Sequence, residues 1–185
     1  PCRIAEVRPQ VGGILQKRLF REGATVRAGE ALYQIDPALY NAALASAEAA
    51  LGRAEANLVP LRLKAERYAA LLEIRAVSPQ DHDEAEAALK LAEAEVAAAK
   101  AAVASARIQL NYTTISAPIS GRIGRSSVTA GALVSAGQAT ALATIQQLDP
   151  IFVDVTRSSS EMLQLKRQIA SGTLKTDASG AAKVT

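Results

Sequence analysis

The hydrophobic pattern divides the chain into a long central segment with a seven-residue period and two flanking segments of short apolar runs. The periodic positions are Leu44, Ala47, Leu51, Ala54, Leu58, Leu61, Ala65, Tyr68 and Leu72, and then Leu89, Ala92, Val96, Ala99, Val103, Ala106 and Leu110. Spacings of three and four residues are the a/d pattern of a coiled coil. The pattern therefore predicts an α-helical hairpin over 38–111, with helices at about 38–74 and 79–112.

Two start signals and one break support these two helices. Asp36-Pro37 and Ser78-Pro79 each place a capping side chain before a proline at the first helical position. The stretch from Glu73 to Ser78 is the one plausible break, and so short a loop makes the helices antiparallel. Pairing residues whose numbers sum to 157 sets large side chains opposite small ones. Pro60 cannot donate a backbone hydrogen bond, so we expect a bend near residues 56–60.

The two flanks carry the same glycine pattern twice, at an offset of 108 residues. The matched pairs are Gly13 and Gly121, Phe20 and Val128, Gly23 and Gly131, Val26 and Val134, and Gly29 and Gly137. Short apolar runs between glycine turns indicate β-strands. Each half has too few strands to bury its own apolar face, so the halves should pair. The pattern predicts a discontinuous β-sandwich of residues 1–37 and 112–145.

Composition excludes several classes of function. The chain has 185 residues, 3% aromatic residues, no Trp and a net charge of +3, without a dominant basic cluster. This charge pattern gives no electrostatic footprint for nucleic acid. No run of 18 apolar residues or signal peptide is visible, and Cys2 reads as an ordinary strand residue. The abrupt ends of the sequence indicate a piece of a longer protein.

Candidate catalytic and metal-binding chemistry is sparse. His82 and Glu86 share a helix face and invite a metal site, but acids at this place also complement the positive end of a helix. With one His, no Ser-His-Asp arrangement is possible, and "SGRIGRS" lacks the ending of a phosphate loop. We therefore expect no enzyme activity, no metal and no cofactor.

The flanking segments resemble a known cofactor-carrying fold. "EGATVRAGEALYQID", followed later by "ISAPISGRIG", resembles the biotinyl/lipoyl carrier domain. Carriers hold their cofactor on a Lys at the turn between the two halves. Here Asp36-Pro37 and the whole helical segment occupy that turn, and no Lys stands there. A carrier domain of an enzyme stays open as an alternative that lacks its attachment residue.

A lipoyl-like domain split by a helical hairpin is similar to the periplasmic adaptor, or membrane fusion, proteins. "RIAEVRPQVGGIL", "NYTTISAPISGRIGRSSVTAGALV", "GQATALATIQQLDPIFVDV" and "LKRQIASGTLK" closely resemble adaptors of tripartite multidrug efflux pumps of the AcrA/MexA type. The resemblance implies an inner-membrane antiporter of the resistance-nodulation-division (RND) class and a TolC-like outer-membrane channel as partners. It also implies a non-catalytic conduit role and, in the assembled pump, a hexamer.

The family resemblance extends past the sandwich. Residues 146–185 resemble the start of a β-barrel domain, with a short helix at about 159–170 that Ser158 and Glu161 begin and Gly172 ends. The fold class expected is thus α+β, a split lipoyl-like sandwich with a hairpin and a partial barrel. The resemblance places the protein in the periplasm of a Gram-negative bacterium, anchored to the inner membrane by an N-terminal lipid absent from this chain.

The family's hairpin tip carries an R-x3-L-x6-S motif that meets the channel, and Arg67, Leu71 and Ser78 match it here. The alternative is that Arg67 is a solvated charge, Leu71 a seam residue and Ser78 only a helix cap. Apolar residues near the tip should be partly exposed and mark an interface. Rival functions are an adaptor of an ATP-driven or type I exporter and a coiled-coil scaffold without a transport role.

Overall fold

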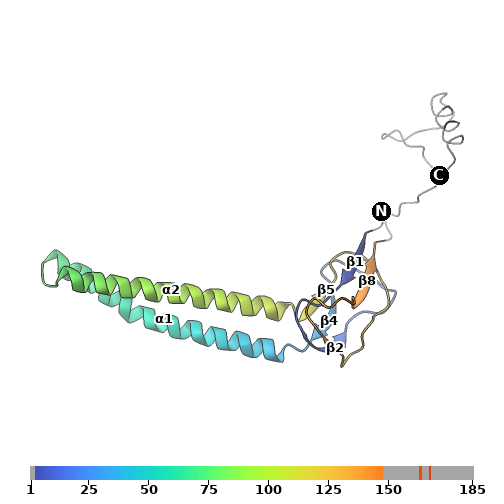
Figure 1. The fold of residues 1–185 in the computed structure, drawn as a ribbon, viewed down its shortest axis with the longest axis horizontal. Coiled ribbons are helices and arrows are strands. Elements are labelled where there is room, and N and C mark those ends of the chain that lie inside the picture. The colour runs from blue at the N-terminus through green and yellow to red at the C-terminus, as the bar shows by residue number, and fades with distance from the viewer. Residues whose placement is uncertain (1–2, 148–162, 164–166, 168–185) are drawn as a thin grey trace. The chain divides into compact units, whose positions relative to one another are not determined.

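The structure, a computed structural model, describes residues 3–147 together with residues 163 and 167 (Figure 1). Its elements are β1 (Ile4–Val7), β2 (Gly13–Arg18), β3 (Thr25–Val26), β4 (Ala31–Ile35), α1 (Ala38–Glu73), α2 (Pro79–Asn111), β5 (Thr114–Ser116), β6 (Gly121–Ile123), β7 (Leu133–Val134) and β8 (Ala143–Gln146). The partial barrel expected over 146–185, including its helix at 159–170, lies outside the described residues.

The helices α1 and α2 run side by side as an antiparallel hairpin, which confirms the predicted coiled coil (Figure 1). The predicted seam positions are the ones withdrawn from solvent. Ala65, Ala92 and Val96 are buried, and the other predicted positions are half-buried. Ala85, which was not among the predicted positions, is also buried, and the remaining helix positions are mostly exposed. In the described part of the chain, neither helix combines the length and hydropathy of a membrane-spanning segment.

Three ion pairs cross from α1 to α2 and report the register of the hairpin. Glu48 pairs with Arg107 at 3.5 Å, Glu55 with Lys100 at 3.8 Å, and Arg62 with Glu93 at 3.7 Å. Each pair is one heptad from the next, and its residue numbers sum to 155, two below the sum predicted for the seam. Exposed pairs of this kind contribute about 0.2–1 kcal/mol each, so they specify alignment more than stability.

The helix starts follow the sequence signals with one difference. Ser78 caps α2 as predicted, because its Oγ accepts the N–H of Asp81 at 3.1 Å. At α1 the cap position falls on Pro37 rather than Asp36, although an Asp36 carboxylate oxygen still accepts the N–H of Ala38 at 3.0 Å. The helix α1 continues through Pro60, which is exposed, and the bend expected there stays a prediction.

The two flanking segments form two four-stranded sheets, with strand orders β1-β8-β6-β3 and β5-β4-β2-β7. Each sheet contains strands from both repeats. Gly13 of the first repeat lies opposite Val134 of the second, and Val26 of the first lies opposite Gly121 of the second. These two pairings are equivalent under the 108-residue offset. Neither repeat completes a sheet alone, which confirms that the halves depend on each other.

The glycine turns and the core also follow the repeat. Gly23, Gly29, Gly131 and Gly137 all have positive φ, which a residue with a Cβ adopts at a cost. The core between the sheets is continuous and includes Val26 and Val134 at equivalent places. Tyr33 is fully buried, packs edge-on against Phe20 at 5.2 Å and donates its hydroxyl to the carbonyl of Leu142. Burial raises the pKa of the Tyr33 hydroxyl.

Backbone and side-chain hydrogen bonds fasten the hairpin to the sandwich. The N–H of Ile35, just before α1, donates to the carbonyl of Thr113, just after α2, at 2.8 Å. The hydroxyl of Tyr40 in α1 donates to the carbonyl of Gly12 at 2.7 Å. Buried Thr113 closes α2 by donating its hydroxyl to Leu110 at 2.7 Å. The two helices therefore leave and rejoin the sandwich at adjacent points.

Candidate functional site at the hairpin tip

The tip is a tight turn built on the last residues of α1. The N–H of Ala76 donates to the carbonyl of Leu71 at 2.9 Å, and the N–H of Arg75 donates to that of Leu72 at 3.0 Å. These two bonds form a Schellman motif, whose left-handed position is usually glycine. Here Arg75 occupies it with φ of 56°. The tip thus holds a long cationic side chain in a backbone conformation that costs about 1–2 kcal/mol.

The motif residues Arg67, Leu71 and Ser78 flank this turn. Arg67 and Leu71 lie one helical turn apart near the end of α1, and Ser78 caps α2. The Arg67 side chain is exposed and, within residues 3–147, makes no ion pair or hydrogen bond. The Ser78 hydroxyl donates to the Asp81 carboxylate at 2.6 Å, so it already serves as a structural cap. Arg67 is the motif side chain left available for a partner.

Apolar side chains gather at the tip and are incompletely covered, as expected. Ile74 is 72% exposed, and Leu71, Leu72 and Val77 are half-buried. Exposed apolar residues beside unpaired cations are typical of a protein interface. A partner surface that covers Ile74 could also accept hydrogen bonds from the guanidinium of Arg67.

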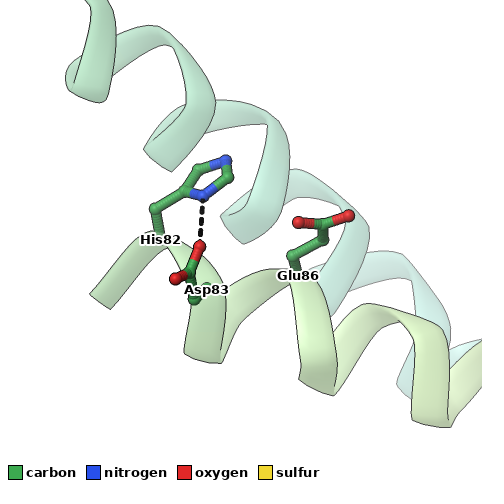
Figure 2. Close-up of side chains that lie close together, drawn as sticks. All are labelled: His82, Asp83 and Glu86. Atoms are coloured by element: carbon green, nitrogen blue, oxygen red, sulfur yellow. Dashed lines mark hydrogen bonds and ion pairs between the residues drawn. The ribbon is translucent and has the colours of Figure 1, made fainter. Parts of the chain in front are cut away.

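A cluster of possible metal ligands lies in the first turns of α2. Figure 2 shows His82, Asp83 and Glu86 together, with one ligand atom of each within 4.8 Å of the others. His82 Nδ1 lies 3.3 Å from an Asp83 oxygen, and Glu86 pairs with Lys90 at 2.7 Å. The hydrogen bond from Lys90 lowers the pKa of the Glu86 carboxyl. These competing pairs and the favourable interaction of acids with a helix N-terminus account for the cluster without a metal.

The hairpin has a second apolar stripe that sequence reasoning missed. It faces away from α2 and consists of Ala38, Ala42, Ala45, Ala49, Gly52, Ala56, Val59 and Leu63, all exposed. The spacing alternates between four and three residues, as in the seam. A matching stripe on α2 consists of Ala87, Ala94, Ala97, Ala101, Ala104 and Ile108, and the charged Lys90 interrupts it after Ala87. Reading the outward b and f positions of the same heptads would have found both stripes.

One edge of the hairpin is also hollow. A groove of about 540 Å³, open to solvent, lies between the helices and is lined by Ala50, Arg53, Ala54, Asn57, Glu95, Ala98 and Ala99. None of these residues takes part in the three ion pairs that cross the hairpin. Ion pairs therefore join the two helices along one edge of the hairpin, whereas mostly small side chains line another edge.

Comparison with known proteins identifies the family in which this architecture occurs. The barrel-sandwich hybrid domain of RND membrane fusion proteins matches residues 3–146. The chain is 56% identical over 182 residues to the multidrug efflux pump subunit AcrA of Escherichia coli K12, covering 98% of this chain and 46% of the relative. It is 54% identical to the toluene efflux pump periplasmic linker protein TtgA of Pseudomonas putida, covering 98% and 44%. The chain thus spans about half the length of these curated relatives.

Comparison with solved structures finds the same fold. A putative efflux transporter of Bacteroides eggerthii has a TM-score of 0.58 and 23% identity, covering 79% of this chain and 40% of that one. At this identity the likeness concerns the fold alone: a helical hairpin inserted in a curled sheet. The fold class is confirmed, and the profile match together with the high identity to efflux adaptors shows that the chain belongs to the RND membrane fusion protein family.

Proposed function

We propose that this chain is part of a periplasmic adaptor that links an inner-membrane RND antiporter to a TolC-like outer-membrane channel. The observation that supports this most directly is the insertion of the hairpin where a carrier domain holds its cofactor. The helical hairpin is inserted between Ile35 and Thr113, which are hydrogen-bonded to each other. The relatives that this chain resembles are named as efflux pump subunits and periplasmic linkers. The role is mechanical and non-catalytic.

The hairpin tip is the surface proposed to contact the channel. Arg67 supplies a guanidinium with no partner in the described part of the chain, and Ile74 supplies an exposed apolar side chain. A guanidinium recognises carbonyl or carboxylate groups through fixed, forked donors, so Arg67 would set the geometry. Leu71 and Ser78 would add apolar contact and a hydroxyl while they hold the turn in shape.

Association of several copies side by side is the second part of the proposal. The outward stripes on α1 and α2 are uncovered within a single chain, and both keep the heptad spacing that packs helices together. In a ring of hairpins, the α1 stripe of one copy would pack on the α2 stripe of the next. A hexamer, as in the assembled pumps of the family, would close such a ring around a conduit.

The family also supports a location. The chain is proposed to act in the periplasm of a Gram-negative bacterium, and relatives named as periplasmic linkers support this location. We propose that the complete adaptor is held at the inner membrane by an N-terminal lipid. Chemistry at the tip is not part of the proposed role, because the Ser78 hydroxyl and the Asp81 carboxylate that accepts its hydrogen bond both serve as the cap of α2.

Cross-linking in an intact envelope tests the tip assignment. A photoreactive group attached through Ser78→Cys should capture an outer-membrane channel protein. Arg67→Asp should reduce that capture about tenfold and lower drug resistance, because a desolvated charge contact contributes on the order of 1.5–3 kcal/mol. The matched control is Arg53→Asp, which reverses a charge two heptads away on the same face of α1. Full capture and full resistance with Arg67→Asp would refute the assignment.

A further inference from the structure

A shallow groove lies over strands β6 and β8 of the sandwich, on a different part of the chain from the hairpin tip. Its volume is about 300 Å³, and it is lined by Gly23, Arg122, Ile123, Gly124, Arg125, Thr144 and Gln146. Two arginines, one hydroxyl and one amide therefore border a single depression. The transport role proposed above does not use any of these groups.

The sandwich around the groove has an excess of positive charge. Residues 3–36 and 113–147 contain eight Arg and Lys but four Asp and Glu, a net charge of +4. Each of the four acids already has a partner. Glu6 pairs with Arg8, Glu22 with Arg18, Glu30 accepts the N–H of Arg27, and Asp36 accepts the N–H of Ala38. The excess cations are left without carboxylates in the described part of the chain.

The acid nearest to the groove illustrates this. Glu22 Oε1 lies 2.6 Å from an Arg18 nitrogen and accepts the backbone N–H of Ser126 at 3.0 Å. The hydrogen bond from Ser126, together with the charges of Arg18 and Arg125, lowers the pKa of the Glu22 carboxyl. Glu22 forms its ion pair with Arg18 and not with Arg122 or Arg125, so neither groove arginine is paired with a carboxylate in the described part of the chain.

The hydrogen-bond donors on the side chains that line the groove are mostly without a partner in the described part of the chain. Arg122 Nε donates to the carbonyl of Gly23 at 2.9 Å, which holds the guanidinium at the rim and leaves its two terminal nitrogens free. Within residues 3–147, Arg122 and Arg125 form no ion pair, and the side chains of Thr144 and Gln146 make no hydrogen bond. Four donor-bearing side chains thus line one depression, and none of its lining residues in the described part of the chain carries a carboxylate.

We propose that this groove binds an oxyanion, either a carboxylate or a phosphate. A guanidinium presents parallel N–H donors that match two oxygens of such a group, and a second arginine adds charge. The threonine hydroxyl and glutamine amide can donate to the remaining oxygens. Phosphate and carboxylate groups are recognised by the same donors. Two different probes, one for each group, therefore distinguish which of them the groove prefers.

Nuclear magnetic resonance of the 185-residue chain tests the proposal. Inorganic phosphate and, separately, a triglutamate peptide are titrated at low ionic strength while backbone amide shifts are followed. Saturable shifts should centre on Gly23 and Gly124. Arg122→Gln and Arg125→Gln should each weaken binding about tenfold, as expected for a charge-assisted contact. Arg27→Gln is the matched control, because it removes the same charge from the same sandwich without lining the groove.

The outcomes separate the alternatives. Tighter binding of phosphate identifies a phosphate site, and tighter binding of triglutamate identifies a site for carboxylates of a protein partner. Equal weakening by Arg27→Gln would overturn the proposal in favour of general surface potential, as would the absence of saturable shifts with both probes. Thermal unfolding of each variant shows that the sandwich is intact. Arg67→Asp should leave the shifts unchanged, so this test is independent of the tip assignment.

Discussion

The sandwich and the hairpin are held together by different kinds of packing, although they belong to one chain. The sandwich buries large side chains such as Leu15, Tyr33 and Ile123 completely, in contacts between residues about a hundred positions apart. The hairpin buries Ala65, Ala85, Ala92 and Val96, which are small. The sandwich therefore depends on one compact core, whereas the hairpin depends on a seam that repeats every seven residues.

This difference in packing predicts which amino-acid substitutions each region tolerates. A core of interlocking large side chains loses stability sharply when one is removed, because the cavity collapses only in part. A seam in which leucines pack against alanines distributes its contacts over many repeated layers, so removing one side chain affects one layer among many. The sandwich can act as a fixed base, while the hairpin surface is available for contacts with other molecules.

The largest effect should come from the core of the sandwich. Leu15→Ala removes a side chain that is 0% exposed and should lower the free energy of unfolding by about 2–5 kcal/mol. Chemical denaturation followed by the near-ultraviolet circular dichroism of the tyrosines, of which Tyr33 is buried in this core, measures the change. The control is Leu133→Ala, whose side chain is 76% exposed on β7 and whose loss should cost less than about 0.5 kcal/mol. Similar losses for both leucines would contradict the contrast drawn between core and surface.

One substitution should have opposite signs in the two regions. At Gly121 an added Cβ would collide with the carbonyl of Gln146, whose carbon lies 2.8 Å away, so Gly121→Ala should destabilise the sandwich by about 1–3 kcal/mol. At Gly52 a Cβ meets no atom within 4 Å, and Gly52→Ala should stabilise α1 by about 0.5–1 kcal/mol. Thermal unfolding of both variants decides the point, and a loss of stability at Gly52 would be unexpected for an uncovered helix face.

The smallest effect on folding should come from the outward stripe of α1. Leu63→Glu and Val59→Glu replace side chains that are 53% and 58% exposed, so the free energy of unfolding should change by less than about 0.5 kcal/mol. Self-association should nevertheless weaken, because a buried unpaired carboxylate is costly. Sedimentation equilibrium over a range of concentrations measures the association, and the control is Asn57→Glu, which introduces the same carboxylate at an exposed position of α1 outside the stripe. Unchanged association would remove the support for hairpins packed side by side.

Sequence periodicity was sufficient for the hairpin because the apolar pattern within each helix is local and regular. A side chain seven residues from Leu44 faces the same way, so the seam could be read directly, and Ser78 could be recognised as a cap. The same heptads contained the outward stripe, which was missed because only the seam positions were considered. The motif residues Arg67, Leu71 and Ser78 come from the family resemblance, and their role in binding stays a proposal.

The turn at the tip was not predictable from residue types. Left-handed positions at helix ends usually carry glycine, so Arg75 gave no signal for a Schellman turn. Its conformation is imposed by the short connection between two packed helices, which leaves few ways to reverse the chain. The assignment of Pro37 rather than Asp36 to the cap of α1 likewise depends on where the backbone leaves β4.

The sequence by itself determined that two glycine-bearing repeats flank a two-helix coiled coil, because turns and heptads are encoded by neighbouring residues. Only the tertiary structure decided which strands of one repeat pair with which strands of the other, and that Arg122 and Arg125 border one groove with Thr144 and Gln146. Such pairings join residues far apart in the chain. They are selected by the shape of a shared core and by which backbone groups remain to be satisfied, and neither is visible in a local pattern.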